Sequence, residues 1–255
     1  MNPSDLTAFI LTRDEERDLP RAITSLPHGV SILVLDACSA DNTVAYARAA
    51  GARVIEREWT DFVDARRFGL AQIETPWTLM LDADEQLDDR LREAILAASG
   101  DADGYRVRRS TYFRGKPMRL WSGESLLRLV RTSLARIEAQ PATGGDALLH
   151  ERLVCDGDVR ELDGTLLHYS YPDARAYLEK FARYTAIEAL AQPPNVPRTL
   201  GEAAMVLPRF GNGLVRRGAL RDGPRGWFVA WYSALYPAVV AWKSLRQSTR
   251  DRKKR

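Results

Sequence analysis

The stretch Trp77-Thr-Leu-Met-Leu-Asp-Ala-Asp-Glu85 decides the fold, because an apolar run ends there abruptly in three carboxylates. Its five largely apolar residues have the length of a strand that is buried on both faces, as in a parallel sheet. The carboxylates then lie at the C-terminal edge of that strand, where open α/β sheets bind their ligands. Asp82 and Asp84 can point to the same side if the chain is still extended, and such a pair suits Mg²⁺ or Mn²⁺. The alternative is a solvated loop that caps the next helix.

Strand-like and helical segments alternate through the first 85 residues. Strands are expected over residues 6–12, 30–35 and 53–57 and from Trp77 onward. Between them we expect one helix that ends near Leu26, a second that begins at an Asp41 cap and ends near Ala50, and a third that begins at an Asp61 cap. Phe62, Ala65, Phe68 or Gly69, and Ile73 form the apolar stripe of the last helix. This alternation is typical of a nucleotide-binding half. Beyond it we expect a helix over 87–98, shorter strands over 105–113, 126–130, 152–155, 159–162 and 165–169, and a helix over 173–191.

Composition indicates an ordinary globular protein, since 45% of the 255 residues are hydrophobic and 28% are charged. Cys38 and Cys155 are the only cysteines, too few for a disulfide framework or a zinc site, so a reducing cytosol is expected. The N-terminal residues lack the basic and apolar regions of a signal peptide.

The C-terminal part of the chain is strongly basic. Residues 209–255 contain 12 Lys or Arg and 2 Asp or Glu, while the whole chain has a formal charge of only +3. Within this part, residues 226–242 carry no charge and include three tryptophans, but 17 residues fall short of the ~20 needed to span a membrane. Aromatic residues beside a basic tail predict an element in the interface of an anionic membrane. The alternative is a terminal helix packed on the body or on a second subunit.

Four ordered stretches carry a resemblance to a known family, and they are Leu11–Glu15, Val34–Thr43, Asp64–Leu70 and Leu81–Glu85. Together they resemble the family 2 glycosyltransferases of the GT-A fold, in particular the bacterial group that includes lipopolysaccharide core glucosyltransferases. His150-Glu151 and Leu167–Tyr171 are similar to the same group, and so, more loosely, is 218–223. The family usually has Asn where Asp14 and Arg67 stand, and glycines where Cys38 and Asn42 stand.

The resemblance implies an α/β fold with a Rossmann-like mixed sheet and flanking helices. Residues 1–198 would form the glycosyltransferase domain, with a nucleotide-binding half at 1–100 and an acceptor half at 101–198, and 199–255 a basic, aromatic helical extension. The implied activity is inverting, metal-dependent transfer of a sugar from a nucleotide-diphosphate sugar, expected to be a UDP-sugar, to a lipopolysaccharide-core or other cell-envelope glycan or lipid-linked acceptor. The enzyme would act at the inner face of the cytoplasmic membrane.

The same resemblance implies which residues bind the donor and the metal. Asp84 is the expected ligand of the divalent cation, and Asp82 binds the metal or the ribose. His168 completes the metal site, touches the diphosphate, or is a structural histidine. Three further residues, Thr12, Glu15 and Asp36, are expected to contact the nucleotide sugar from the ends of the first two strands, and their alternative role is helix capping. Arg66 is expected to contact the diphosphate, because a guanidinium matches phosphate oxygens.

Glu151 is the expected general base for the acceptor hydroxyl, because it occupies the position of the family's His-Glu motif. Glu124 and Glu85 are the alternatives. Direct displacement with inversion requires no covalent nucleophile.

Two other functions are alternatives to glycosyl transfer. A sugar nucleotidyltransferase would have a glycine-rich phosphate loop after the first strand, but Thr12-Arg13-Asp14-Glu15 contains no glycine. A non-catalytic membrane-associated scaffold would gain no thermal stability from nucleotide and Mn²⁺. No motif accompanies the basic tail that would indicate binding of nucleic acid.

Overall fold

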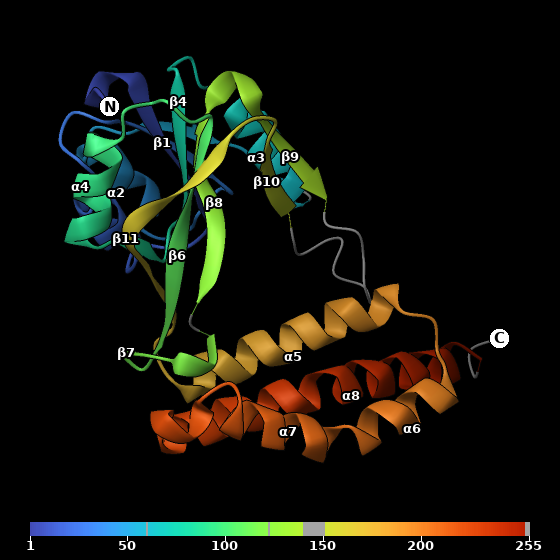
Figure 1. Cartoon of the computed structure of the whole chain (residues 1–255). Helices are drawn as coiled ribbons and strands as arrows, with labels where there is room; N and C mark the ends of the chain where they lie inside the picture. The colour runs from blue at the N-terminus through green and yellow to red at the C-terminus, as the bar shows by residue number, and fades with distance from the viewer. Residues whose placement is uncertain (60, 122, 140–150, 253–255) are drawn as a thin grey trace. The chain divides into compact units, whose positions relative to one another are not determined.

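The computed structural model describes residues 1–59, 61–121, 123–139 and 151–252 (Figure 1). The chain divides into two compact units. The sheet unit comprises Met1–Ser110, Gly123–Gln140 and Leu148–Tyr169, and the helical unit comprises Thr111–Ser122, Pro141–Ala147 and Ser170–Arg255. The division expected at residues 100 and 198 stays a prediction. His150 and the last three basic residues, Lys253, Lys254 and Arg255, lie outside the described residues.

A mixed sheet forms the centre of the sheet unit and confirms the predicted fold class. Its order is β3 (Arg53–Glu56), β2 (Ser31–Asp36), β1 (Leu6–Thr12), β4 (Trp77–Asp82), β8 (Glu124–Arg131), β6 (Gly104–Phe113), β11 (Val159–Tyr171) and β5 (Glu85–Leu87). Parallel pairing joins the first four strands, and β8 continues the sheet antiparallel to β4. A separate antiparallel pair is formed by β9 (Ala135–Ala139) and β10 (Glu151–Cys155).

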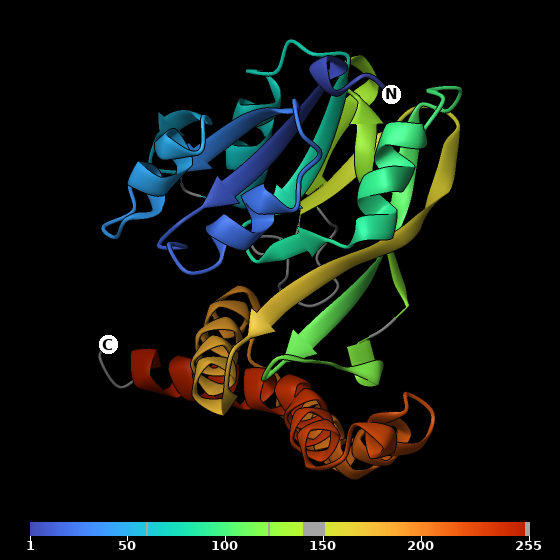
Figure 2. The ribbon, with the colours of Figure 1, turned by 90° about the vertical axis from the view of Figure 1, so that its left-hand side faces the viewer.

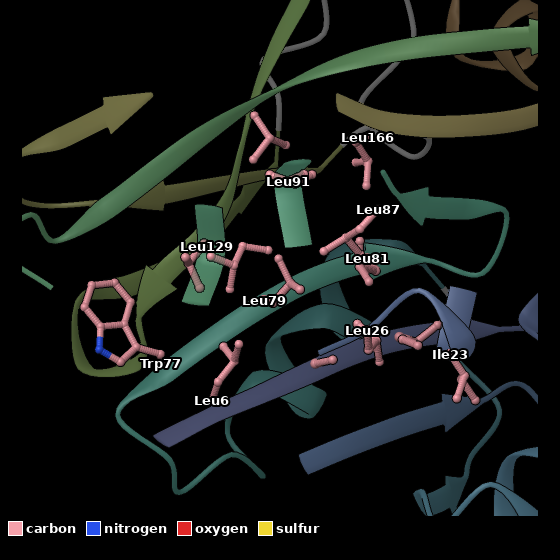
Figure 3. Packing of buried hydrophobic residues seen from close by; sticks show 14 of the residues in the cluster. Leu6, Ile23, Leu26, Trp77, Leu79, Leu81, Leu87, Leu91, Leu129 and Leu166 are labelled. Carbon is pink, nitrogen blue, oxygen red and sulfur yellow. The ribbon is translucent and has the colours of Figure 1, made fainter. Parts of the chain in front are cut away.

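Alternate residues of the central strands pack on opposite faces of this sheet. One face carries Leu6, Leu79 and Leu81, which lie against residues of α1 (Leu19–Thr24), α2 (Thr43–Ala49) and α4 (Asp89–Ala97), as Figure 3 shows in part. The other face carries Phe9 and Met80, which belong to a cluster with residues of α3 (Phe62–Leu70), β9 and β10. Burial on both faces explains why β4 is apolar throughout. The short 3₁₀ turns η1 (Pro3–Asp5) and η3 (Thr132–Leu134) complete the unit.

Several predicted elements are confirmed with small shifts of their ends. Asp61 caps α3 by accepting from the Asp64 amide at 2.7 Å. Asp41 does not cap α2 as predicted, because Asn42 holds the N-cap position, although Asp41 accepts from the Thr43 amide at 3.0 Å. Phe62 was predicted in the apolar stripe of α3 but is exposed.

The segments predicted as two strands, 159–162 and 165–169, form one continuous strand, β11. Gly164 makes this possible, since its φ is +102° and a Cβ there would lie 2.2 Å from the Leu91 amide nitrogen. The predicted helix over 87–98 begins later, at Asp89, because Glu85–Leu87 pairs with β11 as strand β5.

The helical unit contains α5 (Ala174–Ala191), α6 (Val196–Ala204), α7 (Val206–Val215) and α8 (Pro224–Arg252), which Figure 2 shows packed together. The same unit also contains the short elements β7 (Lys116–Pro117), η2 (Arg119–Trp121) and η5 (Ala219–Asp222). Its core is formed by Phe113, Met118, Leu120, Tyr177, Ala219, Val229 and Ala230. No helix in the described ranges is long and apolar enough to cross a membrane.

Candidate active site

The carboxyl ends of three parallel strands meet at one edge of the sheet. Thr12 of β1 pairs in register with Asp36 of β2, and Leu11 is in register with Asp82 of β4. The predicted strand-end residues therefore lie on neighbouring strands, at the edge where α/β sheets bind ligands.

Thr12 and Asp36 form a buried polar pair at this edge. The Thr12 hydroxyl donates to Asp36 Oδ2 at 2.7 Å, and Asp36 also accepts from the amide and the hydroxyl of Ser39 at 2.7 and 2.6 Å. The Glu15 amide donates to the Thr43 hydroxyl at 2.8 Å nearby. These bonds fix the loops after the first two strands; the predicted contacts of Thr12, Glu15 and Asp36 with base and ribose stay predictions.

Cys38 occupies a position where the family described above usually has a glycine, and the backbone conformation at this position is one that favours glycine. Its φ is +57°, in the left-handed region that glycine adopts without steric cost. The loop therefore keeps a glycine-like conformation although its residue has a side chain.

Arg66 joins two carboxylates that are far apart in sequence. From α3, its Nη2 donates to Asp82 Oδ1 and its Nε donates to Glu151 Oε1 at 2.5 Å. The Arg66 side chain is 4% exposed, while Asp82 keeps 33% of its side-chain surface open. The structure thus brings together three residues that the sequence placed in the site.

Arg128 and Glu85 extend the arrangement into the protein. Arg128 Nη2 donates to Asp82 Oδ2 at 3.0 Å and to Glu85 Oε1 at 2.6 Å. Glu85 Oε2 in turn accepts from the Asp82 amide at 3.1 Å. We call Arg66, Asp82, Glu85, Arg128 and Glu151 the carboxylate–arginine cluster.

Charge pairing in this cluster outweighs burial at Asp82. Burial would raise the pKa of Asp82, but the guanidiniums of Arg128 and Arg66 hold that pKa well below its usual range. Burial likewise opposes the charge of Arg128, yet Glu85 and Asp82 raise its pKa. Asp82 is therefore ionised at neutral pH.

Asp84 and His168 form a second pair next to the cluster. Asp84 Oδ2 lies 3.2 Å from His168 Nε2, and the two side chains are 17% and 15% exposed. Two neighbouring ligands of an octahedral cation are about 3 Å apart when each bond is 2.0–2.1 Å, so this pair fits two ligands of one ion. Among the described residues, no group of three His, Cys, Asp or Glu side chains is arranged to hold a metal. Both carboxylate oxygens of Asp82 accept from arginines, and its predicted role as a ligand of the metal or of the ribose stays a prediction.

The alternative bases differ in their surroundings. The Glu85 side chain has no exposed surface and is paired with Arg128 and, at 3.5 Å, with Arg109, so an acceptor hydroxyl cannot reach it. Glu124 is about half exposed and pairs with Arg109 Nη2 at 2.5 Å. Glu151 alone among the three binds to the cluster through Arg66 while keeping part of its side chain exposed.

Sequence reasoning missed Arg128 and Arg109. Both are charged residues inside strands, and Arg128 interrupts the apolar run Leu126–Val130. A charged residue in a buried strand must be paired, so this interruption was the available signal.

Comparisons with known proteins agree on one family. The Glycosyl transferase family 2 model matches residues 7–147. The chain is 30% identical over 252 residues to the lipopolysaccharide core biosynthesis glycosyltransferase LpsC of Rhizobium meliloti strain 1021, with 93% of this chain and 91% of that protein covered. It is 27% identical to a glycosyltransferase of Rickettsia typhi, over 72% of this chain and 66% of that one.

A solved structure supports the fold. The mannosyltransferase PcManGT of Pyrobaculum calidifontis, determined in complex with GDP-Man and Mn²⁺, superposes with a TM-score of 0.51. The superposition covers 96% of this chain and 89% of that one at 12% identity, which supports the fold alone. A family model that covers more than half of the chain, together with a relative aligned over nearly its whole length, shows that this protein belongs to glycosyl transferase family 2 and is a glycosyltransferase.

Proposed function

We propose that the protein is an inverting, metal-dependent glycosyltransferase that moves a sugar from a nucleotide-diphosphate sugar, a UDP-sugar by the resemblance described above, to a cell-envelope glycan acceptor. One observation carries the proposal. Arg66 holds Asp82 and Glu151 together at the strand edge that also bears Asp84 and His168. Guanidinium, carboxylate and imidazole groups at one strand edge support the proposal, because these groups suit a diphosphate, a divalent cation and proton transfer.

The arginines of the cluster suit a diphosphate. Arg66 Nη1 and Arg128 Nε are covered by protein and have no hydrogen-bond partner within the described part of the chain. Buried donors without partners are costly, and guanidiniums match phosphate oxygens well. We propose that donor binding shifts these side chains so that the diphosphate satisfies part of their donor capacity.

Asp84 and His168 are the proposed protein ligands of the cation. A site with few protein ligands suits Mg²⁺ or Mn²⁺, because these ions commonly take the rest of their ligands from substrate phosphates and water. When bound, the cation neutralises the charge that develops on the departing diphosphate. Asp82, held by two arginines, positions the cluster or contacts the ribose.

Glu151 is the proposed general base. Its Oε1 is held by Arg66, whereas its Oε2 accepts no hydrogen bond in the described ranges. Glu151 would take the proton of the acceptor hydroxyl as that oxygen attacks the anomeric carbon. The diphosphate leaves from the opposite side, which inverts the configuration.

The acceptor is proposed from the relatives. LpsC is named for lipopolysaccharide core biosynthesis, and it aligns with 93% of this chain. A lipopolysaccharide-core sugar, presented on a lipid-linked glycan, is therefore the proposed acceptor class.

A peripheral contact with an anionic membrane is proposed for the helical unit. Residues of α8 predicted to lie in the membrane interface, such as Val229 and Val240, are buried, so α8 packs on its neighbours along one face. Trp227 and Trp242 on the other side of α8 are 52% and 50% exposed. Large apolar side chains are also exposed on α6 and α7, where Leu200, Leu207 and Val215 are 67%, 69% and 72% exposed. No residue of α6 is buried.

Basic residues accompany this apolar face. Arg198 lies on α6, Arg216 and Arg217 follow α7, Arg221 lies on η5, and all four are exposed. Exposed apolar residues with basic neighbours are the pattern of helices that lie on anionic lipid surfaces. This contact would place the enzyme at the inner face of the cytoplasmic membrane.

A thermal-shift panel tests the enzymatic proposal. The full-length protein is heated with UDP-glucose, UDP-galactose, UDP-N-acetylglucosamine or GDP-mannose, each with and without Mn²⁺. We expect a Mn²⁺-dependent rise in melting temperature with at least one UDP-sugar, because a ligand that binds only the native state stabilises it. Asp84→Ala should remove the Mn²⁺-dependent part, while the control Asp89→Ala, at a side chain that is 84% exposed, should retain it.

Two results would contradict the proposal. No shift with any donor would favour a non-catalytic scaffold. A Mn²⁺-dependent shift that is unchanged in Asp84→Ala would mean that the metal ligands are wrongly assigned. A nucleotidyltransferase would instead release pyrophosphate from a nucleoside triphosphate and a sugar 1-phosphate, which a pyrophosphate assay detects.

A further inference from the structure

An aromatic cavity of about 280 Å³ lies within the helical unit. Six aromatic side chains from η2, the end of β11, α5 and α8 line it, and they are Trp121, Tyr171, Tyr177, Phe181, Tyr184 and Tyr236. Its volume is near the lower end of the range for small-molecule sites, about 300 Å³. No residue of the carboxylate–arginine cluster takes part in it.

The sequence builds one wall from a single helix face. Tyr177, Phe181 and Tyr184 are spaced by four and three residues on α5, so their rings lie along one side of the helix. Trp121 and Tyr171 form the adjoining wall, with ring centroids 5.4 Å apart. All lining aromatic residues except Tyr177 keep part of their surface exposed.

Polar groups lie among these rings. Pro237 lines the cavity inside α8 and has no N–H, so the Ser233 carbonyl lacks the donor that an uninterrupted helix would supply. Ser233 also lines the cavity, and a hydrogen bond joins its side chain to Tyr177. Tyr236 donates its hydroxyl to the buried carboxylate of Glu188. The residues that line the cavity therefore carry aromatic rings together with hydroxyl and carbonyl groups.

This combination matches the chemistry of a sugar ring. A pyranose has C–H groups on its faces, which pack on aromatic rings, and hydroxyls at its edge, which need hydrogen-bond partners. A hydrocarbon chain would offer no hydrogen-bonding group to the Tyr184 hydroxyl or the Ser233 carbonyl when it displaced water, at a cost. No charged side chain lines the cavity, so a neutral ligand fits it better than an ion.

We propose that this cavity is a glycan-binding subsite that holds one sugar ring of the acceptor. The inference rests on the proposed function in naming the acceptor as a glycan. It goes further in assigning recognition of that glycan to the helical unit. Tyr184 supplies a ring face to the sugar, and Ser233 supplies a hydrogen-bond acceptor.

Ligand-observed saturation-transfer NMR on the full-length protein tests this assignment, because it detects weak binding of free sugars. The probes are methyl glucopyranoside, methyl galactopyranoside and maltotriose, with choline and a short-chain alkyl sulfonate as non-sugar probes. The variants Tyr184→Ala and Trp121→Ala each remove one ring from a different wall. Tyr184→Phe keeps the ring, and Leu190→Ala changes an exposed residue of the same helix outside the cavity.

We expect at least one glycoside to receive saturation from the wild-type protein, Tyr184→Phe and Leu190→Ala. Tyr184→Ala and Trp121→Ala should bind it about tenfold more weakly, the loss expected when an aromatic contact is removed. Signals from none of the glycosides, from the non-sugar probes alone, or undiminished in both alanine variants would overturn the proposal.

Donor binding separates the two proposals. Both alanine variants should keep the Mn²⁺-dependent thermal shift with the UDP-sugar, which also shows that they are folded. Glycoside binding without a thermal shift from any donor would contradict the proposed function but support the glycan-binding subsite. A thermal shift from a donor without glycoside binding would support the proposed function but contradict the subsite.

Discussion

Arg66 Nε donates to Glu151 Oε1 at 2.5 Å, although the two residues stand 85 positions apart in the chain. The guanidinium also holds Asp82, so one side chain sets the separation between a proposed base and the carboxylate at the end of β4.

Replacing Arg66 should disturb both sides of this arrangement. In Arg66→Lys a single ammonium group cannot match both carboxylates as the planar fork does. We expect turnover to fall by about 100-fold, the cost of small misplacements of reacting groups, and the melting temperature to drop. Steady-state rates and thermal melts of the variant check this, with Arg48→Lys, whose ion pair with Glu56 is exposed, as the control. Turnover near that of the wild type would show that Arg66 has no positioning role.

Glu151→Gln tests the base while keeping the contact with Arg66. The amide oxygen can still accept from Arg66 Nε, but it cannot take up a proton. We expect turnover to fall by about 10²–10⁴-fold, with the donor-induced thermal shift unchanged. Glu124→Gln serves as the control at an alternative carboxylate. If Glu124→Gln lost activity and Glu151→Gln did not, the assignment would be reversed.

His168→Ala should weaken the metal site without removing it. One proposed ligand is lost and Asp84 remains, so the Mn²⁺ concentration needed for half-maximal activity should rise by about 10-fold or more. A Mn²⁺ titration of turnover measures this, with His28→Ala as a control at a histidine that is remote in sequence from the proposed ligands. An unchanged Mn²⁺ requirement would make His168 a structural residue.

Gly69→Ala should destabilise the sheet unit. A Cβ at Gly69 would lie 2.0 Å from Phe9 Cζ, and Phe9 is completely buried and cannot move aside. Overpacking of this kind costs about 1–3 kcal/mol of unfolding free energy. Urea denaturation gives the value, and Gly201→Ala, where a Cβ meets nothing within 4 Å, should instead be neutral or stabilising. Equal stabilities of the two variants would speak against close packing of α3 on β1.

The exposed apolar face of α6 and α7 predicts binding to anionic vesicles. The double variant Leu200→Asp/Leu207→Asp should bind phosphatidylglycerol vesicles more weakly in a sedimentation assay, because it loses apolar contact and adds negative charge. Leu96→Asp, a partly exposed leucine of α4, is the control for an added charge. If both variants sediment like the wild type, this face does not contact the membrane.

The first half of the chain was predictable because local patterns and tertiary structure agree there. Strands β2 and β4 are largely apolar and each ends in an aspartate, so Asp36 and Asp82 could be placed at one edge from sequence alone. The pairing of Arg66 with Glu151 was not predictable, since it depends on how β10 folds against α3. Neither residue has a local pattern that indicates the other.

The predictions that were wrong for β11 and α3 also have local causes. The Asp163-Gly164 pair has the appearance of a turn, yet Gly164 lets β11 continue where the backbone of Leu91 comes close. The exposed Phe62 occupies a stripe position in α3, but the buried side of that helix is formed by Ala65, Arg66 and Gly69. An arginine on a buried face is invisible to hydrophobic periodicity, because its burial depends on carboxylates elsewhere in the chain.

Strands β6 and β11 each begin in the sheet unit and end in the helical unit. The helical unit is therefore built from separate segments of the chain, and exchanging it between related proteins requires more than one replacement. A chimera has to exchange Thr111–Ser122 together with the segment from Ser170 onward, because exchanging either segment alone would remove packing partners of Phe113 or Tyr177. Trimming the gene at its 3′ end would have the same damaging effect.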